Sequence, residues 1–178
     1  PLRKTPNAKR TVVVLDKNFR LPASVRPTTY RFRVAPHMHG AAAGTFHASG
    51  TIDLRLDAPA RTITLHGVHI TVERARLHAA GRDLDATVSA HDESQTLAFE
   101  FPDEIPAGLA TLDVAWHGLI HKDLRGLYQA GPIAVTQFEA ADARRLFPCF
   151  DEPPFKAVWE IAVEAPADVA VIGNGADP

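Results

Sequence analysis

The sequence predicts an all-β domain built as an antiparallel two-sheet sandwich, with one short helix near residues 140–147. Three observations favour this fold class. Apolar and polar residues alternate along most of the chain, which is the period of strands with one wet face. Turn-forming residues recur about every 8–12 positions, the spacing typical of a sandwich. The chain also lacks internal repeats and the alternation of strands with helices that marks a parallel sheet.

The first strand is expected at residues 30–34, where apolar side chains face one way and arginines the other. The clearest strand follows at residues 46–57. One of its faces carries apolar and small residues, namely Phe46, Ala48, Gly50, Ile52, Leu54 and Leu56. The opposite face is polar, so we expect a long strand with one solvated side.

Shorter alternating segments predict the remaining strands. They lie at residues 63–65, 68–72, 84–88, 97–101, 112–116, 159–163 and 169–172. Only residues 140–147 have a helical pattern, over about two turns. Pro148 ends this helix because proline cannot continue the backbone hydrogen bonding.

Length and composition exclude several classes of protein. The 178 residues fit one domain, and 19 basic against 21 acidic residues give a net charge of −2. A nucleic-acid-binding domain would be strongly basic, so no nucleic-acid partner is expected. No apolar run approaches the ~20 residues of a membrane span. The single cysteine, Cys149, excludes an internal disulfide.

Two regions are expected along the chain. Residues 1–20 form a basic leader, solvated or serving as an arm for an acidic partner, in which residues 11–15 could add an edge strand. Residues 21–178 form the sandwich. The absence of a signal peptide slightly favours the cytoplasm, whereas the start at Pro1 leaves periplasmic or secreted locations open.

Nine histidines raise the question of a metal site. A zinc-binding H-E-x-x-H helix places two histidines four residues apart around a glutamate. His117 and His121 have this spacing but enclose no acidic residue. We therefore expect most histidines to lie on the surface or at strand edges, and we expect no metal ligand in this chain.

Cys149 lies between Pro148 and Phe150 in an aromatic-rich stretch. A free cysteine in such a place is usually a small buried hydrophobic residue. A nucleophilic cysteine would need a base and a group that orients it, and the sequence locates neither. An independent hydrolase using Cys149 therefore stays a minor alternative.

The most informative segment is TQFEAADARRLFPCFDEPPFK, residues 136–156. It breaks the alternation and interleaves phenylalanines with acidic and basic residues. On composition alone, it could be a long connection that packs its own aromatic rings and pairs its own charges.

This segment resembles the signature of the aminopeptidase N family, zinc metallopeptidases of the gluzincin group. The matching residues are TQFE at 136–139, ARR at 143–145, FPCFDEP at 147–153 and KA at 156–157. Matches at residues 21–30, 46–52, 63–66, 118–128 and 173–175 extend the resemblance over most of the chain. Trp159 stands where a smaller aromatic residue is more usual.

The resemblance implies that this chain is the N-terminal β-domain of such an enzyme. The Gly-x-Met-Glu-Asn motif and the H-E-x-x-H helix of the family belong to a catalytic domain that is absent from this chain. The zinc would be bound there, so the chain is expected to hold no cofactor and no catalytic residue, and to be inactive alone. Its expected partners are the amino end of a peptide substrate and the downstream catalytic domain.

The resemblance also assigns residues to the substrate site. Glu139 would bind the substrate α-ammonium group, and Gln137 would line the pocket for the first side chain. An unusual geometry is expected at the peptide bond between Glu139 and Ala140. The site loop would be held rigid by Arg144, Arg145, Phe147, Asp151 and Glu152. The competing hypothesis is a free-standing β-sandwich binding module that kept the fold without the peptidase.

Overall fold

The computed structural model describes residues 20–175 and confirms the β-rich fold. Its elements are β1 (Val25–His37), β2 (Thr45–Leu56), β3 (Ala60–His66), β4 (Ile70–Ala79), β5 (Arg82–Asp85), β6 (Thr87–His91), β7 (Thr96–Ile105), β8 (Gly108–Leu119), β9 (Gly126–Ala130), β10 (Ile133–Gln137), the 3₁₀ turn η1 (Ala143–Arg145) and β11 (Val158–Val163). The expected leader, apart from Arg20, lies outside the described residues, as does the strand expected at residues 11–15. No helix within residues 20–175 is long and apolar enough to cross a membrane.

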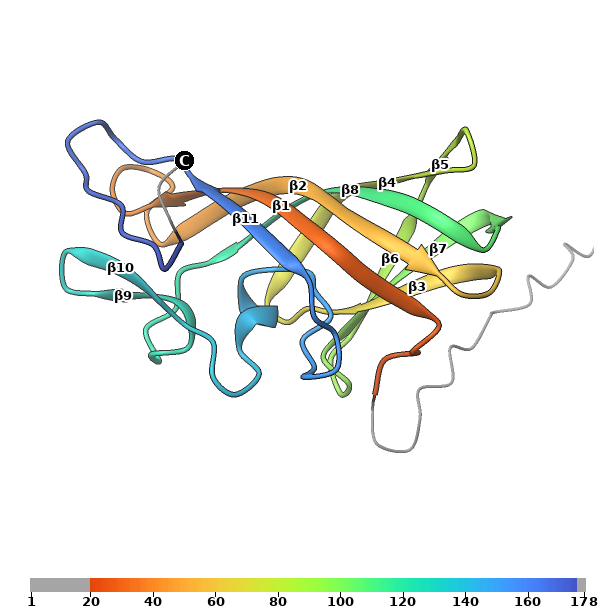
Figure 1. The fold of residues 1–178 in the computed structure, drawn as a ribbon. Helices are drawn as coiled ribbons and strands as arrows, with labels where there is room; N and C mark the ends of the chain where they lie inside the picture. The colour runs from red at the N-terminus through yellow and green to blue at the C-terminus, as the bar shows by residue number, and fades with distance from the viewer. Residues whose placement is uncertain (1–19, 176–178) are drawn as a thin grey trace, which may run out of the picture.

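The strands form three sheets. The largest has six strands in the order β11-β1-β2-β8-β4-β5, the second has three in the order β3-β7-β6, and β9 and β10 form a two-stranded ribbon. In Figure 1 the large sheet arches across the molecule, with the three-stranded sheet below one end and the β9–β10 ribbon below the other.

The core lies between the large sheet and the elements below it. Strand β2 shows the expected alternation, and Ile52 is fully buried on its inner face. The large sheet also contributes Leu112 and Trp116, and the three-stranded sheet contributes Ile63 and Phe99, all without exposed surface. Burying each such side chain stabilises the fold by roughly 1.5–3 kcal/mol.

Two strand predictions are corrected by the topology. The sandwich is not purely antiparallel, because β11 runs parallel to β1 in a register from Thr29–Val158 to Val34–Val163. A parallel pair requires a long connection, which the chain between β1 and β11 supplies. The single strand expected at residues 84–88 is divided at Ala86, so β5 joins the large sheet and β6 the three-stranded one. Alternation cannot reveal such a change, because both halves keep the same period.

The helix expected at 140–147 is only the 3₁₀ turn η1, and its backbone partners explain why. To continue as a helix, the chain would need a hydrogen bond from the N–H of residue 148 to the Arg144 carbonyl. Residue 148 is a proline and has no N–H. The Val68 N–H donates to that carbonyl instead, at 3.0 Å. The Arg144 N–H donates to the Asp151 carboxylate at 3.3 Å. Tertiary contacts therefore replace the helical hydrogen bonds of Arg144, whereas the Leu146 and Phe147 N–H groups still donate to the Ala143 carbonyl.

The strand expected at residues 169–172 is also not formed. This segment follows β11 and has no strand partner within residues 20–175, and Ile172 is 94% exposed. Alternation alone cannot supply a strand, because the backbone groups need a neighbouring ladder.

Candidate functional site

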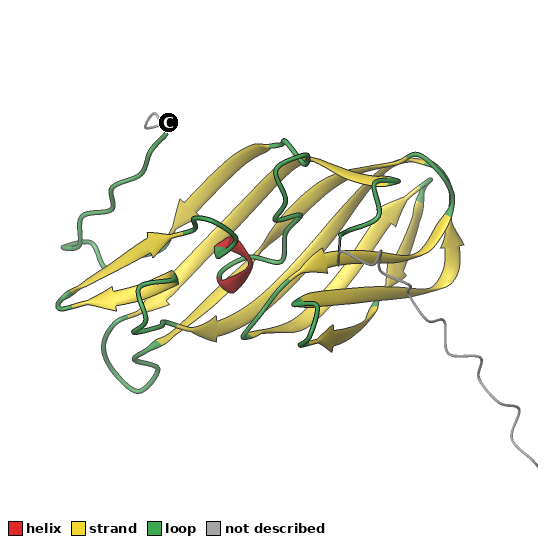
Figure 2. Cartoon of the chain, turned by 90° about the horizontal axis from the view of Figure 1, so that it is seen from below, coloured by secondary structure: helices red, strands yellow, loops and turns green. Residues whose placement is uncertain are grey.

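The signature loop, residues 138–157, connects the β9–β10 ribbon to β11 and lies across one face of the large sheet (Figure 2). Its middle is bound to the end of β3, where His66 and Cys149 exchange two backbone hydrogen bonds of 2.8 and 3.1 Å. The indole N–H of Trp116 in β8 donates to the Leu146 carbonyl at 2.7 Å. The loop is thus attached to strands of both larger sheets.

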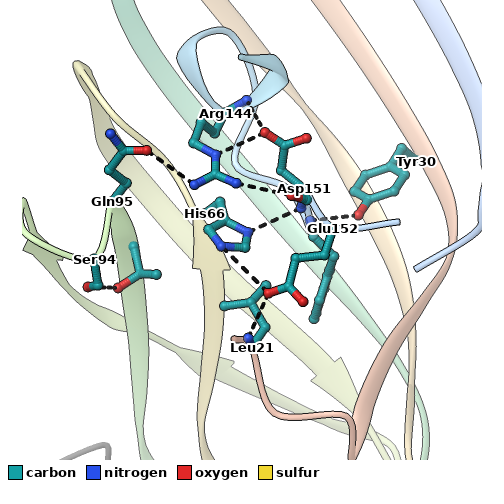
Figure 3. A network of polar contacts seen from close by, with 10 residues as sticks. Leu21, Tyr30, His66, Ser94, Gln95, Arg144, Asp151 and Glu152 are labelled. Carbon is teal, nitrogen blue, oxygen red and sulfur yellow. Dashed lines mark hydrogen bonds and ion pairs between the residues drawn. The ribbon is translucent and has the colours of Figure 1, made fainter. Parts of the chain in front are cut away.

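Arg144 is the centre of a polar network inside this loop (Figure 3). Its Nε donates to Asp151 Oδ2 at 2.9 Å, and its Nη2 donates to the Asp151 carbonyl at 3.0 Å. Its Nη1 donates to Gln95 Oε1 at 3.2 Å, which ties the loop to the turn before β7. The Arg144 and Asp151 side chains are only 12% and 14% exposed. Because this ion pair is shielded from water, removing either partner would leave the other charge unpaired and would destabilise the fold.

His66 joins the same network from β3. The Asp151 N–H donates to His66 Nδ1 at 3.2 Å, so the neutral ring carries its proton on Nε2. That atom faces Glu152 Oε1 at 3.8 Å. The same Glu152 oxygen accepts a 2.8 Å hydrogen bond from the Leu21 N–H. Glu152 therefore connects the loop to the segment that enters β1, as Figure 3 shows.

Burial and the nearby Arg144 guanidinium lower the pKa of His66 from 6.5 to about 3. Below about pH 6.5 the unfolded chain binds a proton at His66 that the folded chain does not bind. The contribution of His66 to the free energy of unfolding is therefore fully present above pH 6.5. It is lost as the pH falls toward 3, at about 1.4 kcal/mol per pH unit.

Substitution of His66 tests this pH dependence. We expect His66→Asn to flatten the fall in the free energy of unfolding between pH 6.5 and 5, because asparagine keeps an acceptor for the Asp151 N–H but does not titrate. Urea unfolding at several pH values measures the slope. The exposed His91 provides the control, since His91→Asn should leave the slope as it is. Parallel slopes for wild type and His66→Asn would contradict the assignment.

Arg145 holds the turn that precedes η1. Its Nε donates to Asp142 Oδ1 at 2.7 Å, with side chains 12% and 17% exposed. The Asp142 N–H in turn donates to the Phe138 carbonyl at 3.0 Å. These bonds fix the short stretch between Phe138 and Asp142, and this stretch contains Glu139.

Aromatic rings lie beneath the loop. Phe147 is 4% exposed, and its ring centroid lies 5.8 Å from that of Phe138, 5.5 Å from Phe32 and 5.4 Å from Trp159. Cys149 is buried beside them, and burial raises the pKa of its thiol well above the ordinary value. A thiol held protonated in this way is a poor nucleophile.

Gln137 and Glu139 lie at the exposed end of this framework. Gln137 is the last residue of β10, and both residues are exposed. The Glu139 N–H donates to Gln137 Oε1 at 3.3 Å, and the Glu139–Ala140 peptide bond is cis, which is the unusual geometry expected there. Within residues 20–175 the Glu139 carboxylate takes part in no ion pair, so it has capacity for a cation from outside.

Sequence reasoning found the charged residues of the loop but missed their partners. His66, Gln95 and Tyr30 contact the loop from positions 49 to 120 residues away. The hydroxyl of Tyr30 accepts a 3.0 Å hydrogen bond from the Phe150 N–H, and burial raises its pKa. No local spacing could have identified these residues, because strand pairing alone brings them to the loop.

Comparison with family models decides what kind of domain this is. The model described as the Peptidase M1 N-terminal domain matches residues 26–177.

The chain belongs to the peptidase M1 family.

Similar proteins include aminopeptidases from plants, yeasts and a bacterium. Aminopeptidase M1-D of Oryza sativa subsp. japonica is 34% identical over 163 residues, which cover 87% of this chain and 18% of the rice protein. Aminopeptidase M1 of Arabidopsis thaliana is 32% identical over 168 residues, covering 87% of this chain and 19% of that protein. Aminopeptidase N of Acetobacter pasteurianus is 31% identical over 167 residues, which cover 86% of this chain and 44% of the bacterial protein.

The peptidase M1 match agrees with the resemblance seen in the signature loop. It covers the large sheet, the three-stranded sheet and the loop together. The chain nevertheless spans only about a fifth of the plant relatives' length. The match therefore does not by itself assign the activity of these longer proteins to this chain.

Proposed function

We propose that this chain forms the wall of an aminopeptidase active site that binds the free amino end of a peptide. The observation that carries the proposal is the exposed Glu139 carboxylate, which forms no ion pair with any residue from 20 to 175 and lies next to an anchored loop in a peptidase M1 N-terminal domain.

Electrostatics favours a carboxylate for this task. The α-ammonium group of a peptide is a cation that must be recognised in a partly dehydrated site. A charge-assisted hydrogen bond to Glu139 would hold it and thereby fix which peptide bond is presented for cleavage. A peptide with a blocked amino end would lack this interaction, which gives selectivity for free amino ends.

Gln137 suits a role beside the first side chain of the substrate. Its amide can donate and accept hydrogen bonds without adding a second charge. Its Oε1 already accepts from the Glu139 N–H. The amide group thus links the orientation of the two residues, and its NH₂ group is available to the substrate.

Rigidity of the loop supports this function. We assign Arg144, Arg145, Asp151 and Glu152 as positioning residues, because their contacts fix the backbone on both sides of η1. Phe147 supports the loop from below through its aromatic neighbours. A carboxylate that is held in place loses less conformational entropy when it binds the substrate.

The family is zinc-dependent, and the chain's own residues do not fit its catalytic zinc. The 178 residues contain no H-E-x-x-H motif. We therefore assign the metal and the hydrolytic step to a catalytic domain outside this chain, and we propose that the chain alone is inactive.

The edge strand β11 is the surface that we assign to contact with that domain. Val158, Trp159, Ile161 and Val163 are 40–59% exposed along it. An apolar strand at a sheet edge requires a covering partner to avoid aggregation.

Substitution of Glu139 in the full-length enzyme tests the proposed function. We expect Glu139→Gln to lower kcat/KM for unblocked peptides about 100-fold, which corresponds to ~2.7 kcal/mol of lost transition-state binding. Glu139→Asp should retain part of the activity because it keeps the charge. Steady-state kinetics with peptide amides measures the effect.

The exposed Glu93, in the turn before β7, offers a matched control. Glu93→Gln makes the same chemical change away from the loop, and kcat/KM should remain at the wild-type value. A folded Glu139→Gln enzyme with kcat/KM within twofold of wild type would remove Glu139 from the substrate site.

A further inference from the structure

Three metal-ligating side chains meet on the outer face of the six-stranded sheet. They are His47 in β2, Glu73 in β4 and His117 in β8. One potential ligand atom from each lies within 4.8 Å of those of the other two. His117 Nδ1 lies 2.8 Å from Glu73 Oε1, and the His47 and His117 rings are 5.8 Å apart between centroids.

The sheet topology creates this cluster. His47 and His117 are direct cross-strand partners in the β2–β8 pair, so their side chains project from the same face. On the other side of β8, the β4 register shifts between Val72 and Arg74. A bulge of this kind changes the direction of side chains, and Glu73 lies within it, exposed and in contact with His117.

A third histidine, His37, orients the His47 ring. His37, the last residue of β1, places its Nε2 3.2 Å from His47 Nδ1. Because Nδ1 of His47 is engaged in this hydrogen bond, Nε2 of the same ring is the atom left to bind a metal. Metal-binding histidines commonly use their second ring nitrogen in this manner, which fixes the tautomer and the ring orientation.

We propose that His47, Glu73 and His117 bind one divalent transition-metal ion. Two imidazoles and one carboxylate are a ligand set that Zn²⁺ accepts, with water completing the tetrahedron. Ca²⁺ and Mg²⁺ prefer oxygen ligands throughout and should bind poorly. The bound ion would take the place of the hydrogen between His117 Nδ1 and Glu73 Oε1, which would move to Nε2 of the same ring, and the ion would join β2, β8 and β4. This proposal departs from the expectation that no residue of this chain binds a metal, and the titration below distinguishes the two.

Zinc titration of the 178-residue chain without an affinity tag tests the proposal. Isothermal calorimetry with ZnCl₂ at pH 7.5 should show one ion per chain, with a Kd of about 1–10 µM. The double variant His47→Gln/His117→Gln should weaken the affinity at least 100-fold, and His37→Phe about 10-fold, since the latter removes only the orienting hydrogen bond. CaCl₂ should give no binding.

Two controls separate this site from other histidines. His91→Gln, at the exposed end of β6, should leave the Kd unchanged. His69 and His121 form another ring pair, 5.6 Å between centroids, so His121→Gln should also leave the Kd unchanged. Circular dichroism verifies folding of each variant, and Zn²⁺ should raise the Tm of wild type but not of the double variant.

Three results would overturn the proposal. The first is no zinc uptake by wild type up to 100 µM. The second is equal affinity in a folded His47→Gln/His117→Gln variant. The third is loss of binding in His121→Gln with retention in the double variant, which would move the ion to the other histidine pair.

Discussion

Replacing Arg144 by methionine is expected to lower the free energy of unfolding by about 3–5 kcal/mol. The change keeps most of the side-chain length but leaves the Asp151 carboxylate, 14% exposed, without its cationic partner. It also removes the donors to Gln95 and to the Asp151 carbonyl. Buried acceptors without donors cost free energy in addition to the lost pair. Urea unfolding of the 178-residue chain at pH 7.5 measures the loss.

A surface ion pair provides the control. Arg33 and Glu164 lie 2.8 Å apart but are 61% and 54% exposed, so Arg33→Met should cost less than about 1 kcal/mol. A similar small cost for Arg144→Met would show that the buried pair contributes little. In the full-length aminopeptidase that we propose, Arg144→Met should also reduce kcat/KM, since the loop around Glu139 loses its central anchor.

Replacing Gly50 by alanine is expected to destabilise the chain by about 4 kcal/mol or more, the range of severe backbone conflicts. Gly50 has φ +155°, and a Cβ there would lie 2.0 Å from the Arg31 carbonyl oxygen and 2.9 Å from the Phe32 Cα. Both obstacles are backbone atoms of β1, so no side-chain rotation can relieve the overlap. Relief requires separation of β1 from β2 at the centre of the six-stranded sheet.

Gly40 supplies the matched control for Gly50. It also has a positive φ, +80°, but a Cβ added there would meet no atom within 4 Å. Gly40→Ala should therefore cost only about 1–2 kcal/mol, the conformational penalty of a left-handed residue. Thermal unfolding monitored by circular dichroism compares the two variants. Equal Tm values would contradict the argument that the close approach of β1 decides the effect.

The strands of the large sheet were predictable from sequence where one face is buried and the other solvated. Residues 46–57 and 112–116 alternate strictly, and they form much of β2 and β8 at the sheet centre. The division at Ala86 was not predictable, since both sheets impose the same two-residue period on the side chains. The helix expected at 140–147 failed for another reason, because the loop's backbone groups bind side chains and strands distant in sequence.

The candidate substrate site was predictable only in part. The signature residues, including Gln137 and Glu139, were identified through their resemblance to a family and not through their chemistry. Their surroundings were not identified: His66 looked like one of many surface histidines, yet it is 3% exposed and its side chain contacts two loop residues, Asp151 and Glu152.

The amino-acid sequence by itself determined the strand-rich class, the family and the loop in which the peptidase signature lies, because alternation and a local motif are properties of neighbouring residues. The tertiary structure alone decided which residues distant in sequence lie close together in space. The Arg144 network and the His47–Glu73–His117 cluster each unite residues from separate strands or from a strand and the loop. Such groupings depend on strand order and register, and these are set by the packing of the whole core, so no spacing along the chain records them.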